Sequence, residues 1–112
     1  MSSRRVVLRT QAARDVEAAV DYYTSEAGES VAFGFVDAFA KALERLSRHP
    51  SSGSLRYSHI IEILGLRSLV LSRYPYVIFY LADGDSIDVW RILHARSDIP
   101  AWMSDTDDRP YS

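Results

Sequence analysis

The side chains best suited to chemistry in this sequence are one histidine and four arginines between positions 67 and 96. A histidine can donate or accept a proton near neutral pH, and arginines can stabilise the negative charge that develops on a phosphorane. These residue types suffice for RNA cleavage, in which one group takes the 2′-hydroxyl proton and another protonates the leaving oxygen. The five residues are Arg67, Arg73, Arg91, His94 and Arg96.

The same side chains also have a purely structural interpretation. In it, His94 hydrogen-bonds to hold the end of a strand, and the arginines pair with Asp88 or Asp98. The composition favours this interpretation, because the chain carries 15 acidic against 13 basic residues and a formal net charge of −2, whereas binding to phosphates rests on a basic surface. We therefore expect no catalytic residue and no direct binding of nucleic acid by the isolated chain.

Other kinds of site lack the residues they need. Because the chain has no cysteine, a thiol nucleophile, a disulfide and a cysteine zinc site are excluded. The three histidines are far apart in the sequence, and no nucleophile elbow, phosphate loop or dinucleotide fingerprint occurs, so we expect no metal and no cofactor. No apolar run approaches the ~20 residues of a membrane span, and the N-terminus lacks a signal-peptide core. The expected location is the cytoplasm.

One α+β domain over residues 1–103 is expected to position these side chains. Residues 5–9 predict a strand, and Thr10 is a candidate N-cap. Two helices follow and form a hairpin, joined at Gly28 by a loop of a few residues. Phe33 is about 100° off the apolar stripe of the second helix and is expected to pack at its edge. The helices span residues 11 to about 25 and about 30–47, and the stripe consists of Ala32, Phe35, Val36, Phe39, Leu43 and Leu46.

Three further strands are expected to form an antiparallel meander in a small twisted sheet, with the helical hairpin on one face. An Asp83-Gly84 turn joins the last two strands. The last strand alternates between two sets of side chains, and both sets are largely apolar. Since a sheet covered on one face should have a polar outer face, either the C-terminal tail or a partner is expected to cover it. The strands span residues 66–72, 76–82 and 86–93, and the two sets are Ile87, Val89, Arg91 and Leu93, and Asp88, Trp90, Ile92 and His94.

The C-terminal residues predict a short helix and a tail. Asp98 is the expected N-cap of the helix, with Pro100 in its first turn. Trp102 and Met103 on this helix either close the edge of the core or present an apolar anchor to a partner. Residues 104–112 are acidic and polar, so we expect a flexible tail there.

Ordered matches along residues 5–103 resemble the ParE-type toxins of the RelE/ParE superfamily, from bacterial type II toxin–antitoxin modules. The clearest matches are the strand YVIFY (residues 76–80) and RILHARSDIP (residues 91–100), although Ser97 replaces an arginine that the family often has. The weaker matches are LRTQAARD (residues 8–15), Tyr22 with Tyr23, Leu43, Leu46, Pro50, Gly53, and Leu66 with Arg67. The resemblance implies the compact α+β fold described above.

The resemblance also implies a partner and a target. The partner is a ParD-like antitoxin in a hetero-oligomer, whose C-terminal segment would wrap the helices and the sheet. The target is DNA gyrase, inhibited by protein contact, whereas RelE-type relatives cut mRNA on the ribosome. The acidic chain with Lys41 as its sole lysine favours the gyrase-directed toxin over the nuclease. The expected residues for contact with antitoxin or target are Arg67, Arg73, Arg91, His94, Arg96, Trp102 and Met103.

Overall fold

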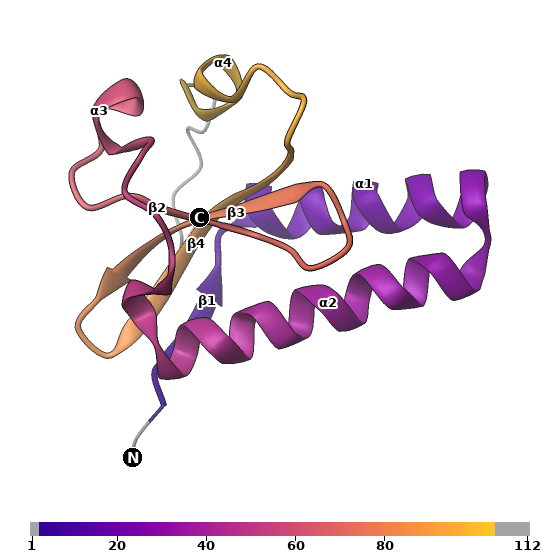
Figure 1. Ribbon diagram of the computed structural model, residues 1–112, viewed down its shortest axis with the longest axis horizontal. Helices are drawn as coiled ribbons and strands as arrows, with labels where there is room; N and C mark the ends of the chain where they lie inside the picture. Colours follow the sequence, from indigo (N-terminus) through magenta and orange to yellow (C-terminus); the bar gives the residue numbers. More distant parts are fainter. Residues whose placement is uncertain (1–2, 105–112) are drawn as a thin grey trace.

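The structure, a computed structural model, describes residues 3–104. Of the predicted tail, residues 105–112 lie outside the described residues, whereas Ser104 ends the C-terminal helix. The structure confirms the predicted α+β class: a four-stranded sheet in the order β1-β4-β3-β2, with two long helices, α1 and α2, on one face (Figure 1). None of its helices, within the described residues, is long and apolar enough to cross a membrane. The elements are β1 (Arg5–Leu8), α1 (Thr10–Ala27), α2 (Glu29–Arg48), η1 (Pro50–Ser52), α3 (Ser58–Ile61), β2 (Arg67–Val70), β3 (Tyr76–Asp83), β4 (Ser86–His94) and α4 (Ile99–Ser104).

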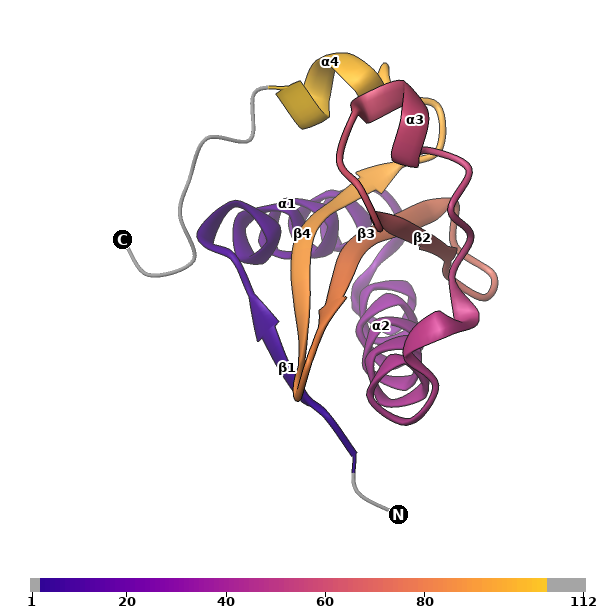
Figure 2. The ribbon, with the colours of Figure 1, turned by 90° about the vertical axis from the view of Figure 1, so that its left-hand side faces the viewer.

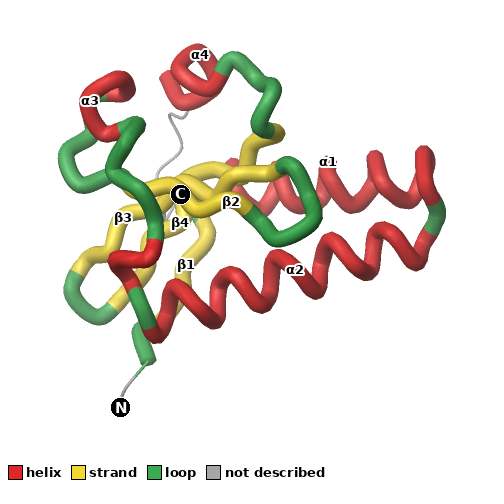
Figure 3. The backbone as a smooth tube through the Cα atoms, in the orientation of Figure 1, coloured by secondary structure: helices red, strands yellow, loops and turns green. Residues whose placement is uncertain are grey.

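The sheet is a meander with one strand added from the start of the chain. β2, β3 and β4 pair antiparallel, as predicted, and β1 pairs parallel with β4. This arrangement places the two ends of the sheet at β1 and β2 (Figure 3). The turn between β3 and β4 lies at Gly84 and Asp85, because Asp83 already pairs with Ser86. Gly84 has a φ of 58°, a left-handed conformation that glycine adopts without steric cost.

The helical hairpin turns on a single residue rather than on a loop of several. α1 ends at Ala27 and α2 begins at Glu29, and Gly28 between them has a φ of 94°. The prediction of Thr10 as N-cap is also wrong: Thr10 is the first residue of α1, and Arg9 occupies the cap position without a side-chain cap bond. The reason is that Arg9 still belongs to the sheet, since its N–H donates to the Val89 carbonyl at 3.0 Å.

The apolar stripe of α2 is buried along most of its length. Phe35 and Leu46 are fully buried, whereas Val36, predicted on the stripe, is 42% exposed and Phe33, predicted to pack at its edge, is 70% exposed. Both exceptions lie in the first half of α2, where the helical hairpin extends past the sheet (Figure 1). Phe33 and Val36 therefore remain exposed there, although Tyr74 packs on another side of this half of α2, where its hydroxyl donates to the Val31 carbonyl at 3.1 Å.

A β-bulge changes the predicted alternation of β4. The register places Phe79 opposite Arg91 and Tyr80 opposite Val89, so Trp90 is an extra residue on β4. An extra residue reverses the faces of all side chains that follow it. Leu93 was expected on the same face as Ile87 and Val89, but it packs on the outer face. Ile92 joins the core under α1 and α2 in its place.

The outer face of the sheet carries a second apolar core, covered by the chain itself. Leu66, Val77, Phe79 and Leu93 pack there with Ile99 and Met103 of α4. Tyr57, Ile61 and Ile63, around α3, flank this cluster, and Figure 2 shows α3 and α4 next to each other on the side of the sheet away from α2. The prediction that the tail or a partner covers this face is therefore wrong, because α4 and the segment before β2 cover it.

Candidate functional site

Three of the seven predicted contact residues gather where β4 ends. His94 is the last residue of β4, Arg96 is exposed in the following turn, and Trp102 on α4 is 48% exposed. The Nδ1 atom of His94 accepts a hydrogen bond from the Arg96 backbone N–H at 3.0 Å, and its ring meets Tyr76 edge-on at 5.2 Å. His94 therefore shapes the turn that presents Arg96, as the structural interpretation of this histidine expects.

A shallow groove of 230 Å³ lies beside this turn. Its exposed aromatic walls are Trp102 from α4 and Tyr22 from α1, which is 57% exposed. Burial, and after it the neighbouring Tyr22, raises the pKa of Tyr76, so this phenol stays protonated at neutral pH. The exposed walls of the groove therefore offer aromatic contact surface. Its lining residues are Asp15, Ala18, Ala19, Tyr22, Tyr76, Ile92, Leu93, His94, Ser97 and Trp102.

Arg91, predicted as a contact residue, is buried in an ion pair with α1. Its side chain is 1% exposed, and its Nε and Nη2 atoms donate to the two carboxylate oxygens of Asp15 at 2.7 and 2.9 Å. Its Nη1 atom donates to the Trp102 carbonyl at 2.9 Å. Asp15 also accepts the Ile92 N–H at 3.0 Å. The pair thus joins α1, β4 and α4 beneath the groove, and its guanidinium does not reach the surface.

Trp102 and Met103 on α4 differ in exposure. Met103 is 3% exposed and closes the outer core, whereas Trp102 faces solvent. Asp98 caps α4 as predicted, since its Oδ1 atom accepts the Ala101 N–H at 3.4 Å. The Asp98 side chain therefore stabilises the start of the helix that carries Trp102.

Arg67 and Arg73 lie in a different part of the molecule. Arg67 on β2 donates to the Gly53 carbonyl at 2.8 Å and so holds the loop after η1. Arg73 is exposed in the loop after β2 and lines a hollow formed with α2, and this hollow shares no lining residue with the groove at the end of β4. The predicted contact residues therefore do not form one site.

The sequence did not reveal which arginine pairs with Asp88. The partner is Arg9, whose Nη2 atom lies 3.1 Å from the carboxylate. The Arg9 guanidinium also stacks 3.7 Å from the centre of the Trp90 ring, and the Trp90 Nε1 donates to Asp88 at 3.1 Å. These contacts fix the bulge residue against the start of α1, so their role is structural.

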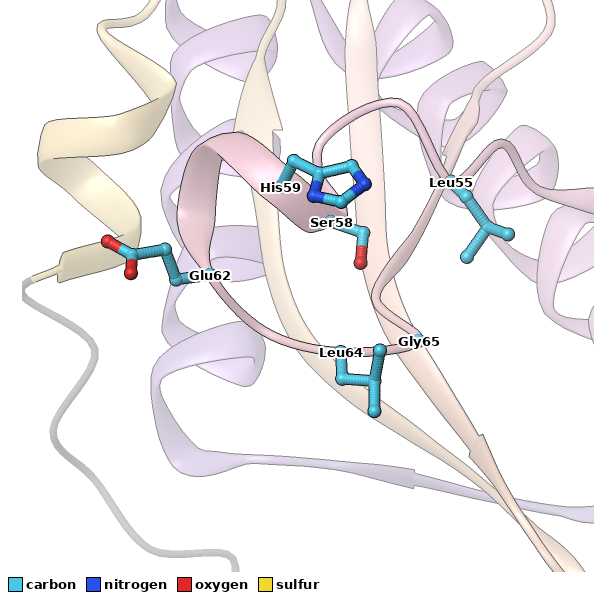
Figure 4. Close-up of a pocket in the computed structure, with 6 residues that line it drawn as sticks. All are labelled: Leu55, Ser58, His59, Glu62, Leu64 and Gly65. Carbon is cyan, nitrogen blue, oxygen red and sulfur yellow. The ribbon is translucent and has the colours of Figure 1, made fainter.

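A larger hollow of 500 Å³ lies at α3, but its side chains do not form a reactive group (Figure 4). The Ser58 hydroxyl donates to the Ile63 carbonyl at 3.0 Å, which holds the turn, and Leu64 is 95% exposed. Within residues 3–104 no three metal-binding side chains cluster. The lining residues are Leu55, Ser58, His59, Glu62, Leu64 and Gly65.

Comparisons with known proteins identify the family. The family model described as "ParE toxin of type II toxin-antitoxin system, parDE" matches residues 6–99, while a search of curated proteins found no match. A solved structure, titled "Chromosomal ParDE TA system from P. aeruginosa", is similar with a TM-score of 0.68 and 26% sequence identity. The match covers 82% of this chain and 96% of that chain. The chain therefore belongs to the ParE toxin family of type II toxin–antitoxin systems.

Proposed function

We propose that this ParE-family toxin inhibits DNA gyrase in the cytoplasm by protein contact, without catalysing a reaction, and that a ParD-like antitoxin neutralises it. The observation that carries the proposal is the surface at the end of β4, where Trp102, Tyr22 and Arg96 are exposed around a groove. Tryptophan, tyrosine and arginine are the residue types that contribute most to protein–protein binding energy.

Two of the side chains that a nuclease would need, Arg91 and His94, make hydrogen bonds within the fold. The Arg91 guanidinium is bound by Asp15 and the Trp102 carbonyl, so it is not positioned to stabilise a phosphorane. One ring nitrogen of His94 accepts a backbone hydrogen bond from the Arg96 N–H, so that nitrogen is not available as a general base. These contacts favour a binding toxin over a ribosome-dependent mRNA endonuclease.

The burial and position of the proposed contact residues reduce their number and divide them between two surfaces. Arg91 and Met103 are buried, so neither is proposed to contact a partner. Arg96 and Trp102, with the half-buried His94 between them, are proposed to contact the target. Arg67 and Arg73 lie on the β2 side of the molecule, and we assign that side to the antitoxin. The target and the antitoxin would then use different surfaces.

The order in which cellular processes stop tests this proposal. Inducing the chain in bacteria that lack its antitoxin should halt DNA synthesis first, because blocked gyrase stalls replication, and protein synthesis should fall only later. Incorporation of labelled thymidine and labelled methionine, sampled over the first minutes, measures this order. An early collapse of protein synthesis with continued DNA synthesis would support mRNA cleavage instead. Co-expression of the antitoxin should restore both signals.

A further inference from the structure

A groove runs between α2 and the edge strand β2, on the side of the molecule away from the β4 end. It consists of two adjoining hollows of 290 and 230 Å³ that share Ala38, Lys41 and Ser72. From Gly34 to Arg45 the wall on α2 is about 17 Å long at 1.5 Å per residue, the length of about five extended residues. The remaining lining residues are Gly34, Asp37, Ala42 and Arg45 from α2 and Leu69, Val70, Arg73 and Tyr74 from the strand side.

The strand side of this groove is an open sheet edge. β2 is the last strand of the sheet, and Ser68 exchanges backbone hydrogen bonds with Ser54 at 2.8 and 2.9 Å on its outer side. Val70 follows two residues later, so its N–H and C=O point the same way. Among the residues that the structure describes, these two groups have no hydrogen-bond partner. A sheet edge of this kind is a template for another strand.

The charge of the groove is opposite to that of the chain. The whole chain has a net charge of −2, but the groove is lined by the cations Lys41, Arg45 and Arg73 and by one carboxylate, Asp37. Asp37 pairs with Lys41 at 3.0 Å in an exposed position. The positive charges of Arg45 and Arg73 are therefore not balanced by a carboxylate of the groove lining. Such a surface favours an anionic partner, and the open strand edge selects a peptide backbone over a nucleic acid.

We propose that this groove binds an extended acidic segment of the antitoxin, which adds as a further strand to the edge of β2 at Val70. Its outward backbone groups pair with Val70, and its carboxylates meet Arg45 and Arg73. The inference rests on the toxin–antitoxin function proposed above and names the surface and the chemistry of the partner. The groove and the β4 end share no lining residue, so the segment bound at Val70 and the target contact different residues.

Binding of the full-length chain to the protein encoded by the neighbouring antitoxin gene, measured by calorimetry, tests this inference. Val70→Pro removes the outward N–H without removing a bond to β3, and proline is tolerated on edge strands. It should weaken binding roughly tenfold or more, whereas Val70→Thr should bind like wild type. Arg45→Glu and Arg73→Glu should weaken binding to a similar extent. Arg5→Glu, which makes the same charge change on β1 at the opposite edge of the sheet, should not.

Folding is checked separately for each variant. Arg73 has a φ of 72°, a conformation that glycine adopts more readily. Arg73→Gly should therefore melt no lower than wild type and still bind more weakly, which separates lost contact from lost stability. Wild-type affinity in Val70→Pro and in both charge reversals would contradict the proposed binding of the antitoxin in this groove. It would not contradict the toxin–antitoxin function itself. If the wild-type chain itself does not bind the antitoxin, both proposals fail.

Discussion

Replacing Arg91 with methionine is expected to lower the free energy of unfolding by about 3–5 kcal/mol, because removal of one partner leaves a buried charge without compensation. The Asp15 side chain is 11% exposed, and two of its hydrogen bonds come from the Arg91 guanidinium. The substitution also removes the hydrogen bond from Arg91 to the Trp102 carbonyl, which should loosen α4. Urea unfolding followed by circular dichroism measures the change.

The double variant Arg91→Met with Asp15→Asn is the matched control. Asparagine is neutral and can still accept the Ile92 N–H that Asp15 accepts at 3.0 Å. The double variant should therefore be more stable than Arg91→Met alone, since the uncompensated charge is gone. A loss of less than about 1 kcal/mol in the single variant, typical of exposed pairs, would contradict the structural role of this ion pair.

Amino-acid substitutions at the end of β4 should distinguish a toxin that acts by binding its target from one that acts by catalysis. Trp102→Ala and Arg96→Glu are each expected to weaken target binding by about 2 kcal/mol or more, the scale of interface hot spots. That loss is roughly 30-fold in affinity. His94→Gln keeps a hydrogen-bond acceptor for the Arg96 N–H but cannot exchange a proton near neutral pH, so its toxicity should persist. Growth of antitoxin-free cells after graded induction measures all three.

The nuclease alternative predicts the opposite order for these variants. Loss of a general acid or base typically costs 10²–10⁴-fold in rate, so His94→Gln would then be harmless. Each protein must first show the wild-type melting temperature, because Trp102 also lies 5.5 Å from the Arg91 guanidinium. Folded, harmless His94→Gln beside fully toxic Trp102→Ala would refute the binding-toxin account.

The fold was predictable where its signals are local. Helical periodicity, Gly28 and the Asp-Gly pair fix the helical hairpin and the last turn within a residue or two, because each acts on its own neighbours in the sequence. The bulge at Trp90 was not predictable, since it depends on packing against Arg9, 81 positions earlier in the chain. Without the bulge, strict alternation puts Leu93 on the wrong face.

The candidate site was predictable only in part, for the same reason. The end of β4 was recognised from its concentration of polar and aromatic residues. The sequence gives no sign, however, that Arg91 is paired with Asp15, 76 positions away. It also did not single out Tyr22 as a groove wall, because the tyrosine pair at positions 22 and 23 suits a buried helix face equally well. Only the packed structure shows which tyrosine faces outward: Tyr22 is exposed, and Tyr23 is partly buried.

The most direct test of the central claim is a supercoiling assay. Purified full-length chain is added to DNA gyrase, ATP and relaxed plasmid, with the chain and its antitoxin together as the control. The account predicts that supercoiling falls with increasing chain, or that cleaved gyrase–DNA complexes accumulate, and that the antitoxin prevents either effect. Unchanged supercoiling at every dose, together with cut mRNA when the same protein is added to translating ribosomes, would contradict it.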